Sequence, residues 1–563
     1  MALLLLGAAT ALPLEAQYTV GRLEGTIFDP AGAVVSEAKV TLQNLGTGAT
    51  RTYVTGPDGL YVFFAMPAGD YELTAEALHF AKKHERIQIL TSETTSRNMT
   101  LGVDPQSATI DVLSEMPGNL NITDAQHSTT RTDLELSSLP SSGRNMISLI
   151  HLAPGVQPMN NPRGGSTFGG GGSLVLVLGP QAGLFSANGG RARSASVQLD
   201  YTDANDWEYG GFALGMQSVT PEMLEEFKLL TSNFSAEYGV KSNAEVIMVS
   251  KSGTNNLHGS AYDFVQNTLF NARDYFDRSG HATPVQSNVY GVSAGGPAIR
   301  NRTFLFGAYE GRRIRGNAFT TVANLPTEAA RARASDPIIT DLMTRYLPLP
   351  TINPEDPNFG QLPTQIPSPI NTYQLLLKAD QRLSAGHSLS ARYLQSSGSF
   401  VARSAGQNTL PGFDTDIHFA LNNANLTDSY VVNMRTVNQL RLSYGYARAL
   451  SLPQNGVVTP RFQIVGAVPL NFGSLNINPQ ERRFNIYQIN DTLSHSRGGH
   501  ILSMGFDVRR IQDHSQADTN TRGVFTFSSL AGFLAGVHAG SCREPWTRQR
   551  VACPCSILRC RGP

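Results

Sequence analysis

The 563-residue sequence has no cysteine before Cys542, no excess of either charge, and no long apolar run beyond its first residues. Lysine plus arginine equals aspartate plus glutamate at 44 each, so no basic surplus points to a nucleic-acid partner. Away from the N-terminus, no stretch of eighteen apolar residues could form a membrane-spanning helix. Spanning β-strands stay possible, because about ten alternating residues per strand give only a weak hydropathy signal.

The four cysteines gather in the last segment, at Cys542, Cys553, Cys555 and Cys560. They do not form two Cys-x-x-Cys pairs and the segment contains no histidine, so the ligand pattern of a zinc site is missing. A terminal disulfide cluster is a second interpretation. Five arginines and the loss of strand periodicity favour a third, in which residues 541–563 are an out-of-frame tail.

The N-terminus reads MALLLLGAATALPLEAQ. The apolar run and the small-residue site at Ala16 are typical of a signal peptide. No lysine or arginine precedes the run, so a start codon placed too far downstream and a buried N-terminal helix are alternatives. We expect residues 1–16 to be a signal peptide, because a globular β pattern begins directly afterwards.

Residues 17–102 show short alternating segments separated by tight turns such as Gly-Pro-Asp-Gly at 56–59. Strands at this spacing predict a small β-sandwich. The order GTIFDPAGAVVSEAKV followed by TGPDGLYVFFAMPAGDYELTAEALHF resembles the carboxypeptidase regulatory-like domain. The resemblance implies a seven-strand immunoglobulin-like module without catalytic residues. His79 stands where that family usually has glycine, so we expect a slightly different turn there.

Residues 103–253 have a mixed pattern, which predicts a linker and a small α+β domain. Residues 133–140 and 145–150 have helical spacing, and Pro221 suits the first turn of a further helix. Met223, Leu224 and Phe227 would form the buried face of that helix. The Gly-rich tract at 164–173 predicts a mobile segment. The apolar run at 246–249 predicts the last strand of this domain.

From residue 254 to about 540 the pattern has period two. Leu440, Leu442, Tyr444 and Tyr446 alternate with polar residues or glycine, and residues 388–393 and 502–509 behave alike. An apolar face opposite a polar face is expected where lipid lies outside and water inside. A soluble antiparallel sheet with one wet face is the alternative. The fold class is therefore mainly β, with a partial antiparallel barrel after the α+β domain.

The motifs of enzymes and metal proteins are absent or out of context, so we expect no catalytic, cofactor-binding or metal-binding residues. Gly-Val-Ser-Ala-Gly at 291–295 matches a nucleophile elbow, but a strand-like segment follows it instead of a helix. Asp200, Asp203, Asn205 and Asp206 could offer oxygen ligands to calcium, although their spacing is not that of an EF-hand. A polar turn within a compact domain is the preferred interpretation.

Four segments together resemble TonB-dependent receptors of the Oar-like type. They are GGRARSASVQLD, VTPEMLEEFKLLTSNFSAEYGVKSNAEVIMVSKSGTNNLHGSAYDFVQN, LFNARDYFD and GGPAIRNRTFLFGAYEGRR. The resemblance implies a plug domain inside an outer-membrane barrel of a Gram-negative cell. Tyr201 departs from the glycine common in that family, and residues 242–244 replace its usual small glycines. Both departures concern loop geometry.

The resemblance also implies a partner and a ligand. A TonB box before the plug would pair as an added strand with the TonB energy-transducing complex, and Ile110, Asp111 and Val112 are the best match. The last strand of the sandwich, or a plain linker, is the alternative for this segment. A polar hinge between plug and barrel is expected at Ser250, Lys251, Ser252, Gly253, Thr254 and Asn255, with Gly253 permitting the turn. The barrel would contact outer-membrane lipid, and the nutrient ligand would be a saccharide, a peptide or a siderophore.

Two functions follow as alternatives. The first is a TonB-dependent outer-membrane receptor for energy-coupled uptake, without enzymatic activity. Because residues 254–540 supply only about half of some 22 strands, this chain is expected to be truncated and not to transport alone. The second is a secreted or surface β-rich protein that binds glycans or other proteins. A periplasmic metallopeptidase is a third class, but its ligand set is missing.

Overall fold

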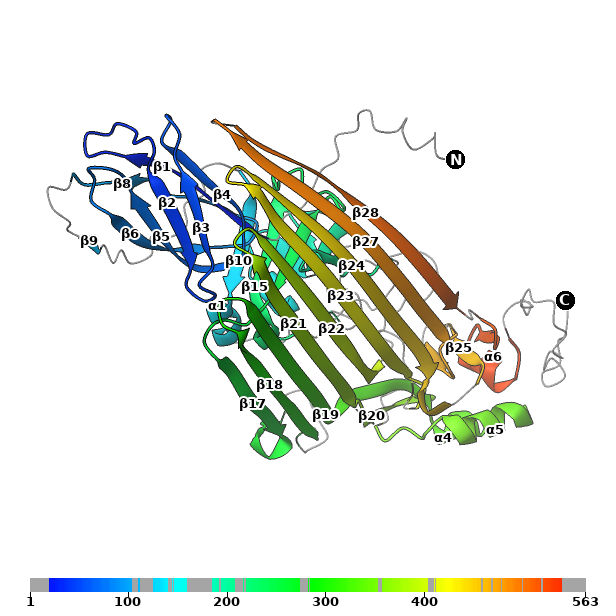
Figure 1. The fold of residues 1–563 in the computed structure, drawn as a ribbon. Coiled ribbons are helices and arrows are strands. Elements are labelled where there is room, and N and C mark those ends of the chain that lie inside the picture. Colours follow the sequence, from blue (N-terminus) through cyan, green and yellow to red (C-terminus); the bar gives the residue numbers. More distant parts are fainter. Residues whose placement is uncertain are drawn as a thin grey trace, which may run out of the picture.

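The computed structural model describes residues 20–103, 110–111, 125–139, 144, 146–158, 185–191, 194–207, 216, 219–273, 282, 284–352, 357–402, 410, 412–456, 459–466, 469–476, 478–498, 500–517 and 520–538. The predicted signal peptide (1–16), the Gly-rich tract (164–173) and the cysteine-containing tail (541–563) lie outside the described residues. The described chain forms a β-sandwich, a middle domain and a large curved sheet with a loop cluster at one end (Figure 1).

The sandwich consists of two sheets packed around one apolar core. One sheet contains β1 (Gly21–Phe28), β4 (Leu60–Met66), β7 (Thr94–Ser96) and β8 (Met99–Thr100). The other contains β2 (Lys39–Asn44), β3 (Thr50–Val54), β5 (Gly69–Glu76), β6 (Lys83–Ile89) and β9 (Ile110–Asp111). Along β1 buried and partly exposed residues alternate strictly, which confirms the predicted sandwich pattern.

His79, which stands in place of a family glycine, keeps the conformation that glycine would allow. Its φ is 69°, in the left-handed region that favours glycine. The backbone N–H of Phe80 donates to the carbonyl of Ala77 at 3.2 Å, so a tight turn still forms. The substitution therefore places a strained histidine in the turn instead of removing the turn.

The middle domain is built on a five-stranded mixed sheet in the order β10-β15-β16-β13-β14. Its strands are β10 (His127–Thr132), β13 (Ala195–Leu199), β14 (Thr202–Asp203), β15 (Leu224–Ser232) and β16 (Ala244–Ser250). The predicted short helices form as α1 (Asp133–Ser138) and α2 (Ile147–Ile150), and β11 (Val156–Pro158) pairs with β12 (Phe185–Ala187). The predicted last strand at 246–249 is confirmed as part of β16.

The predicted helix after Pro221 is wrong. Pro221–Met223 forms a single 3-10 turn, and the chain continues directly as β15. This strand lies between β10 and β16 and buries both of its faces: Phe227 enters one apolar cluster and Leu230 another. Apolar residues on both faces of a strand imitate the spacing of a helical stripe, so the pattern was misread.

The large sheet contains ten strands, nine of them in the sequential order β17-β18-β19-β21-β22-β23-β24-β27-β28. Their bounds are β17 (His258–Asn267), β18 (Val285–Ile299), β19 (Thr303–Pro326), β20 (Phe359–Pro367), β21 (Ile370–Ser384), β22 (His387–Ala402), β23 (Thr415–Asn433), β24 (Thr436–Pro453), β27 (Gln480–Arg497) and β28 (His500–Ala517). All neighbours are antiparallel, and β20 pairs with the far half of β19. The period-two pattern predicted from residue 254 is confirmed, and its first strand begins at His258.

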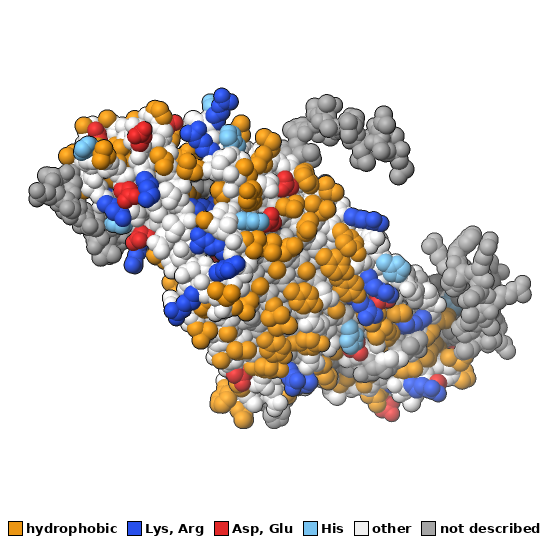
Figure 2. Space-filling model, in the orientation of Figure 1, with side chains coloured by type: hydrophobic (Ala, Val, Ile, Leu, Met, Phe, Trp, Pro, Cys, Tyr) orange, Lys and Arg blue, Asp and Glu red, His pale blue; other side chains and the backbone are white. Residues whose placement is uncertain are grey.

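The outer face of this sheet carries a broad belt of apolar and aromatic side chains (Figure 2). On β24, Leu442 and Tyr444 are exposed, whereas Gln439 and Arg441 are buried on the opposite face. Polar residues are thus buried and apolar residues exposed, the reverse of a sheet that packs an apolar face on a core. This inversion is the arrangement expected when the outer face meets lipid.

A cluster of loops gathers at the end of the sheet away from the sandwich (Figure 1). It contains α4 (Glu328–Arg331), α5 (Pro337–Tyr346), α6 (Leu530–Leu534) and a small sheet of β25 (Arg461–Ile464), β26 (Leu470–Phe472) and β29 (Val524–Phe527). The segment between α5 and β21 is a loop only in part, because it contains β20. No helix in the described residues has the length and apolar character to cross a membrane.

Candidate functional site

The turn and strands at 199–207 join the middle domain to the inner face of the large sheet through three ion pairs. Asp200 faces Arg392 of β22, with Nε and Oδ2 2.9 Å apart. Asp203 faces Arg509 of β28 at 2.7 Å, and Asp206 faces Arg482 of β27 at 3.2 Å. Three of the four residues considered as calcium ligands, all but Asn205, therefore neutralise arginines from three strands. In the part of the chain that the structure describes, no group of three or more His, Cys, Asp or Glu side chains could hold a metal ion.

Asp200 is the most constrained of these acids. Besides Arg392, it accepts hydrogen bonds from the backbone N–H and the Oγ of Ser250, at 3.0 and 2.6 Å. Burial alone would raise the pKa of Asp200, but Lys378, Arg392 and Ser250 outweigh it, so the pKa is lowered. Arg392 also donates to the carbonyl of Leu199 at 3.0 Å. The carboxylate thus stays charged while buried between two domains.

Tyr201, the residue that replaces a family glycine, makes a fourth contact. The guanidinium carbon of Arg441 lies 4.0 Å from the centre of the Tyr201 ring, and both side chains are almost fully buried. Asp200 and Tyr201 both adopt positive φ, at 45° and 70°. The turn that a glycine would make without strain is therefore kept, and the ring gains a cation–π contact with β24. We call the contacts of residues 200–206 with the arginines the lock.

The predicted hinge residues Ser250, Lys251, Ser252, Gly253, Thr254 and Asn255 lie in the connection between β16 and β17. Ser250 still belongs to β16, and its carbonyl accepts from Lys378 Nζ at 3.0 Å. Lys251 Nζ pairs with Asp133 at 2.6 Å, and the backbone N–H of Asn255 donates to Gly46 of the sandwich at 2.8 Å. All three domains therefore hold this connection.

Gly253 has a different role from the predicted one. Its φ is not positive, so the turn does not require glycine for conformational reasons. A Cβ atom at this position would lie 2.4 Å from the carbonyl oxygen of Leu305 and 2.8 Å from that of Gly296. Close approach to two strands of the sheet, and not the turn, is what excludes a side chain here.

The sandwich is held against the middle domain by two buried charged residues of β15. Lys228 donates to the carbonyls of Thr91 and Ser92 and pairs with Glu93 at 2.9 Å. Glu226 accepts from the backbone N–H of Thr91 at 2.9 Å. We call these contacts the clamp. The clamp has no clear signal in the sequence, because Glu226 and Lys228 stand two residues apart among apolar residues, and the spacing of those apolar residues resembles that of a helix.

Burial raises the pKa of Glu226 to about 7, against the opposing effects of the Thr91 hydrogen bond and Lys228. Burial likewise raises the pKa of Glu245, on β16, to about 7. Both carboxyls therefore take up protons near neutral pH. Of the two, only Glu226 belongs to the clamp.

The predicted TonB-box residues lie next to the sandwich. Ile110 and Asp111 form β9, which pairs in parallel with Lys83 and His84 of β6, while Val112 lies outside the described residues. This is the alternative expected for the last strand of a sandwich. It uses only two residue pairs, so the segment is extended and held by few hydrogen bonds.

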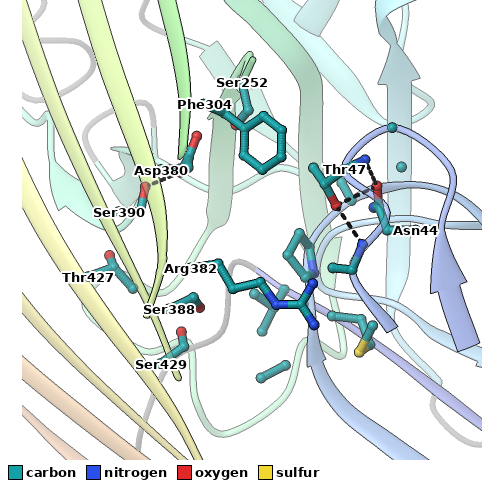
Figure 3. Close-up of a pocket in the computed structure, with 18 of the residues that line it drawn as sticks. Asn44, Thr47, Ser252, Phe304, Asp380, Arg382, Ser388, Ser390, Thr427 and Ser429 are labelled. Atoms are coloured by element: carbon teal, nitrogen blue, oxygen red, sulfur yellow. Dashed lines mark hydrogen bonds between the residues drawn. The ribbon is translucent and has the colours of Figure 1, made fainter. Parts of the chain in front are cut away.

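A cavity of about 650 Å³ lies between the sandwich, the hinge and the inner face of β21 to β24. Figure 3 shows its walls: Asn44 and Thr47 come from the sandwich, Ser252 from the hinge and Phe304 from β19. Strands β21 to β23 contribute a further six labelled polar side chains, Asp380, Arg382, Ser388, Ser390, Thr427 and Ser429. The lock residues Asp200, Arg392 and Arg441 also line it, so it connects the lock to the underside of the sandwich.

Residues 22–102 match the carboxypeptidase regulatory-like domain. The "TonB-dependent transporter Oar" of Myxococcus xanthus is 23% identical over 305 residues, which are 51% of this chain and 26% of that protein. The chain thus spans about a quarter of the length of this curated relative.

Among the many solved structures similar to this chain are a transporter and a receptor. The outer membrane transporter YddB from Escherichia coli has a TM-score of 0.47 at 10% identity. The match covers 71% of this chain and 50% of the YddB chain. The siderophore receptor PirA from Acinetobacter baumannii has a TM-score of 0.43 at 14% identity. The match covers 69% of this chain and 48% of the PirA chain.

The family described as "Outer membrane beta barrel domain" matches residues 249–549. This range begins at the end of β16 and includes all ten strands of the large sheet. It agrees with the apolar outer face described above. Because the match covers more than half of the chain, this protein belongs to the outer membrane beta barrel domain family, and it is a protein of the outer membrane.

Proposed function

We propose that this protein is a TonB-dependent receptor for energy-coupled uptake, in which the middle domain acts as the plug. The family and the similarity to a TonB-dependent transporter support a role in outer-membrane transport. The observation that carries the plug assignment is the lock, which joins residues 200–206 to β22, β24, β27 and β28. A plug needs such contacts with the inner face of its barrel, and they must be reversible.

Charge pairs suit a reversible lock. Forming a buried ion pair requires both charges to lose their hydration, so the net contribution of the pair to stability is small. Removing one partner is nevertheless strongly destabilising, because the other charge stays buried without compensation. The lock therefore holds the plug in one position and resists partial displacement. A pull strong enough to move the whole turn would release all of its contacts together.

The compatible ligands are scarce or large nutrients such as a saccharide, a peptide or a siderophore.

The pull would be applied at Ile110, Asp111 and Val112. Strand addition to a partner uses main-chain hydrogen bonds, and β9 now makes them with β6 over only two residue pairs. The energy-transducing protein TonB would take the place of β6 along this segment. Because few bonds are exchanged, the replacement has a low energetic cost.

Hydrogen exchange of the full chain in detergent, with and without the periplasmic domain of TonB, tests this proposal. We expect added TonB to protect residues 110–112 and to expose Lys83 and His84. Ile110→Pro removes a backbone donor and should abolish the protection. Asn121→Pro, outside the segment, is the matched control and should leave it intact. Protection elsewhere, or none at all, would reject this segment as the TonB box.

The large sheet has two open edges. Among the described strands, β17 and β28 each pair with one neighbour only in this sheet. Unpaired backbone groups are costly in lipid, and an open sheet encloses no pore. We therefore expect no uptake by this chain alone. Electrophoresis of outer-membrane fractions with and without heating tests this, since a heat-modifiable band typical of a closed barrel would refute it.

A further inference from the structure

Two arginines from different domains face the cavity beneath the sandwich. Arg382 extends from the end of β21 into this space, as Figure 3 shows. Arg51, on β3 of the sandwich, lines the same cavity and donates to the carbonyl of Phe64 at 2.6 Å. Among the residues that the structure describes, neither arginine has an acid within 4.0 Å. Two cations therefore line one cavity, and neither has an acid in direct contact.

This arrangement is unfavourable for the empty protein. Burial lowers the pKa of Arg51, and the nearby charge of Arg382 lowers it further, against the effect of Tyr71. A guanidinium nevertheless stays charged, so the two arginines repel each other and lose part of their hydration, which destabilises the empty cavity. A ligand of opposite charge would remove this cost.

Four acids also line the cavity, Asp70, Asp200, Glu225 and Asp380, but in the described part of the chain none of them forms an ion pair with Arg51 or Arg382. Asp380 accepts from Ser390 Oγ at 2.6 Å, and Asp200 is held by Arg392 and Ser250. Ser388 lies on the cavity wall beside Arg382 (Figure 3), and in the described part of the chain its hydroxyl has no hydrogen-bond partner. The cavity thus offers two guanidiniums and one neutral donor.

We propose that this cavity binds an oxyanion, a carboxylate or a phosphate group, between Arg382 and Arg51, with the Ser388 hydroxyl as an additional donor. Planar guanidinium groups match the oxygen spacing of both anions and can donate two parallel hydrogen bonds. Such a ligand would join the sandwich to the rim of the sheet. The site does not depend on the uptake function, since it is defined by contacts between these two domains.

Isothermal titration of the full chain in detergent with inorganic phosphate, and separately with propionate, tests the proposal. We expect at least one of these anions to bind, and Arg382→Gln and Arg51→Gln each to raise its Kd by roughly tenfold or more, because each removes a charged hydrogen bond. Arg382→Lys keeps the charge and should lose less. Arg300→Gln is the control, since Arg300 is exposed at the same rim but does not line the cavity.

The two anions distinguish the ligand class, because tighter binding of phosphate indicates a phosphate ligand and tighter binding of propionate a carboxylate. Hydrogen exchange at residues 44–51 is the second readout. We expect the anion to slow it in the native chain and not in Arg382→Gln, with equal exchange of both without anion to show an intact fold. Failure of both anions to bind, or the same Kd in both glutamine variants and the native chain, would overturn the proposal.

Discussion

Single side chains of opposite charge determine how the domains of this protein hold together. The lock and the clamp both use buried charges, and each charge meets a partner from another domain. In such sites the loss of one partner matters more than the net gain from the pair, because the remaining charge stays buried without compensation. Predictions for single residues follow from this asymmetry.

Asp206→Asn should destabilise the middle domain by about 3 kcal/mol, because it leaves Arg482 buried without its carboxylate. Urea unfolding followed by Trp207 fluorescence, in a Trp546→Phe background, measures the effect. The double variant with Arg482→Met should lose less than the sum of the two single variants. Asp341→Asn, in an exposed pair on α5, should leave the midpoint unchanged. Additive losses would show that the two residues do not interact.

Docking of the sandwich should weaken as pH rises. The pKa of Glu226 is about 7 in the folded protein against an ordinary value of 4.5, so the folded state binds the proton more tightly. Docking is then strongest below about pH 4.5, falls as pH rises to 7, and levels off above it, with a total change of the order of 3 kcal/mol.

Exchange of the Thr91 amide, corrected for intrinsic pH effects, measures this change because that amide donates to Glu226. Glu226→Gln should flatten the profile, since the variant side chain does not titrate. Glu37→Gln, at an exposed position of the sandwich, should keep the native profile. A profile that falls in the same way in both variants would assign the pH dependence to another group.

Among the structural elements, the connection between β16 and β17 is the covalent link between the middle domain and the large sheet. It is fixed by contacts from all three domains, and Gly253 lies against the backbones of two strands of the sheet. A side chain there would push the connection away from the sheet. The position of this connection thus depends on one close backbone approach.

Gly253→Ala should cost about 1–3 kcal/mol, because its Cβ would collide with two carbonyl oxygens that cannot move independently. Thermal unfolding of the detergent-solubilised chain measures the loss. Gly239→Ala is the matched control, since a Cβ at that position meets no atom within 4 Å. Equal stability of the two alanine variants would show that the connection yields without cost.

Local patterns predicted some elements well and others badly, for physical reasons. The sandwich strands and β24 have one buried face, so their alternation was visible in the sequence. Strand β15 buries both faces, so its pattern matched a helix. The lock could not be predicted, because the arginines lie about 190 to 310 residues from their acids along the chain. Two signals did mark this turn, the cluster of acids at 200–206 and the glycine-replacing Tyr201, but neither indicated the arginine partners.

For the whole molecule, the central claim is that the large sheet stands in the outer membrane with lipid on one face and the plug on the other. The exposed apolar belt and the buried polar inner face both follow from it. The claim predicts a change of environment at every residue along a strand.

Single-cysteine labelling along β24 in outer-membrane vesicles tests this most directly, with the four tail cysteines replaced by serine. A fluorophore at positions 440, 442 and 444 should be quenched by a lipid-embedded quencher, and one at 439, 441 and 443 should not. Period-two alternation is the predicted result. Equal quenching at all six positions, or none at any, would contradict the account.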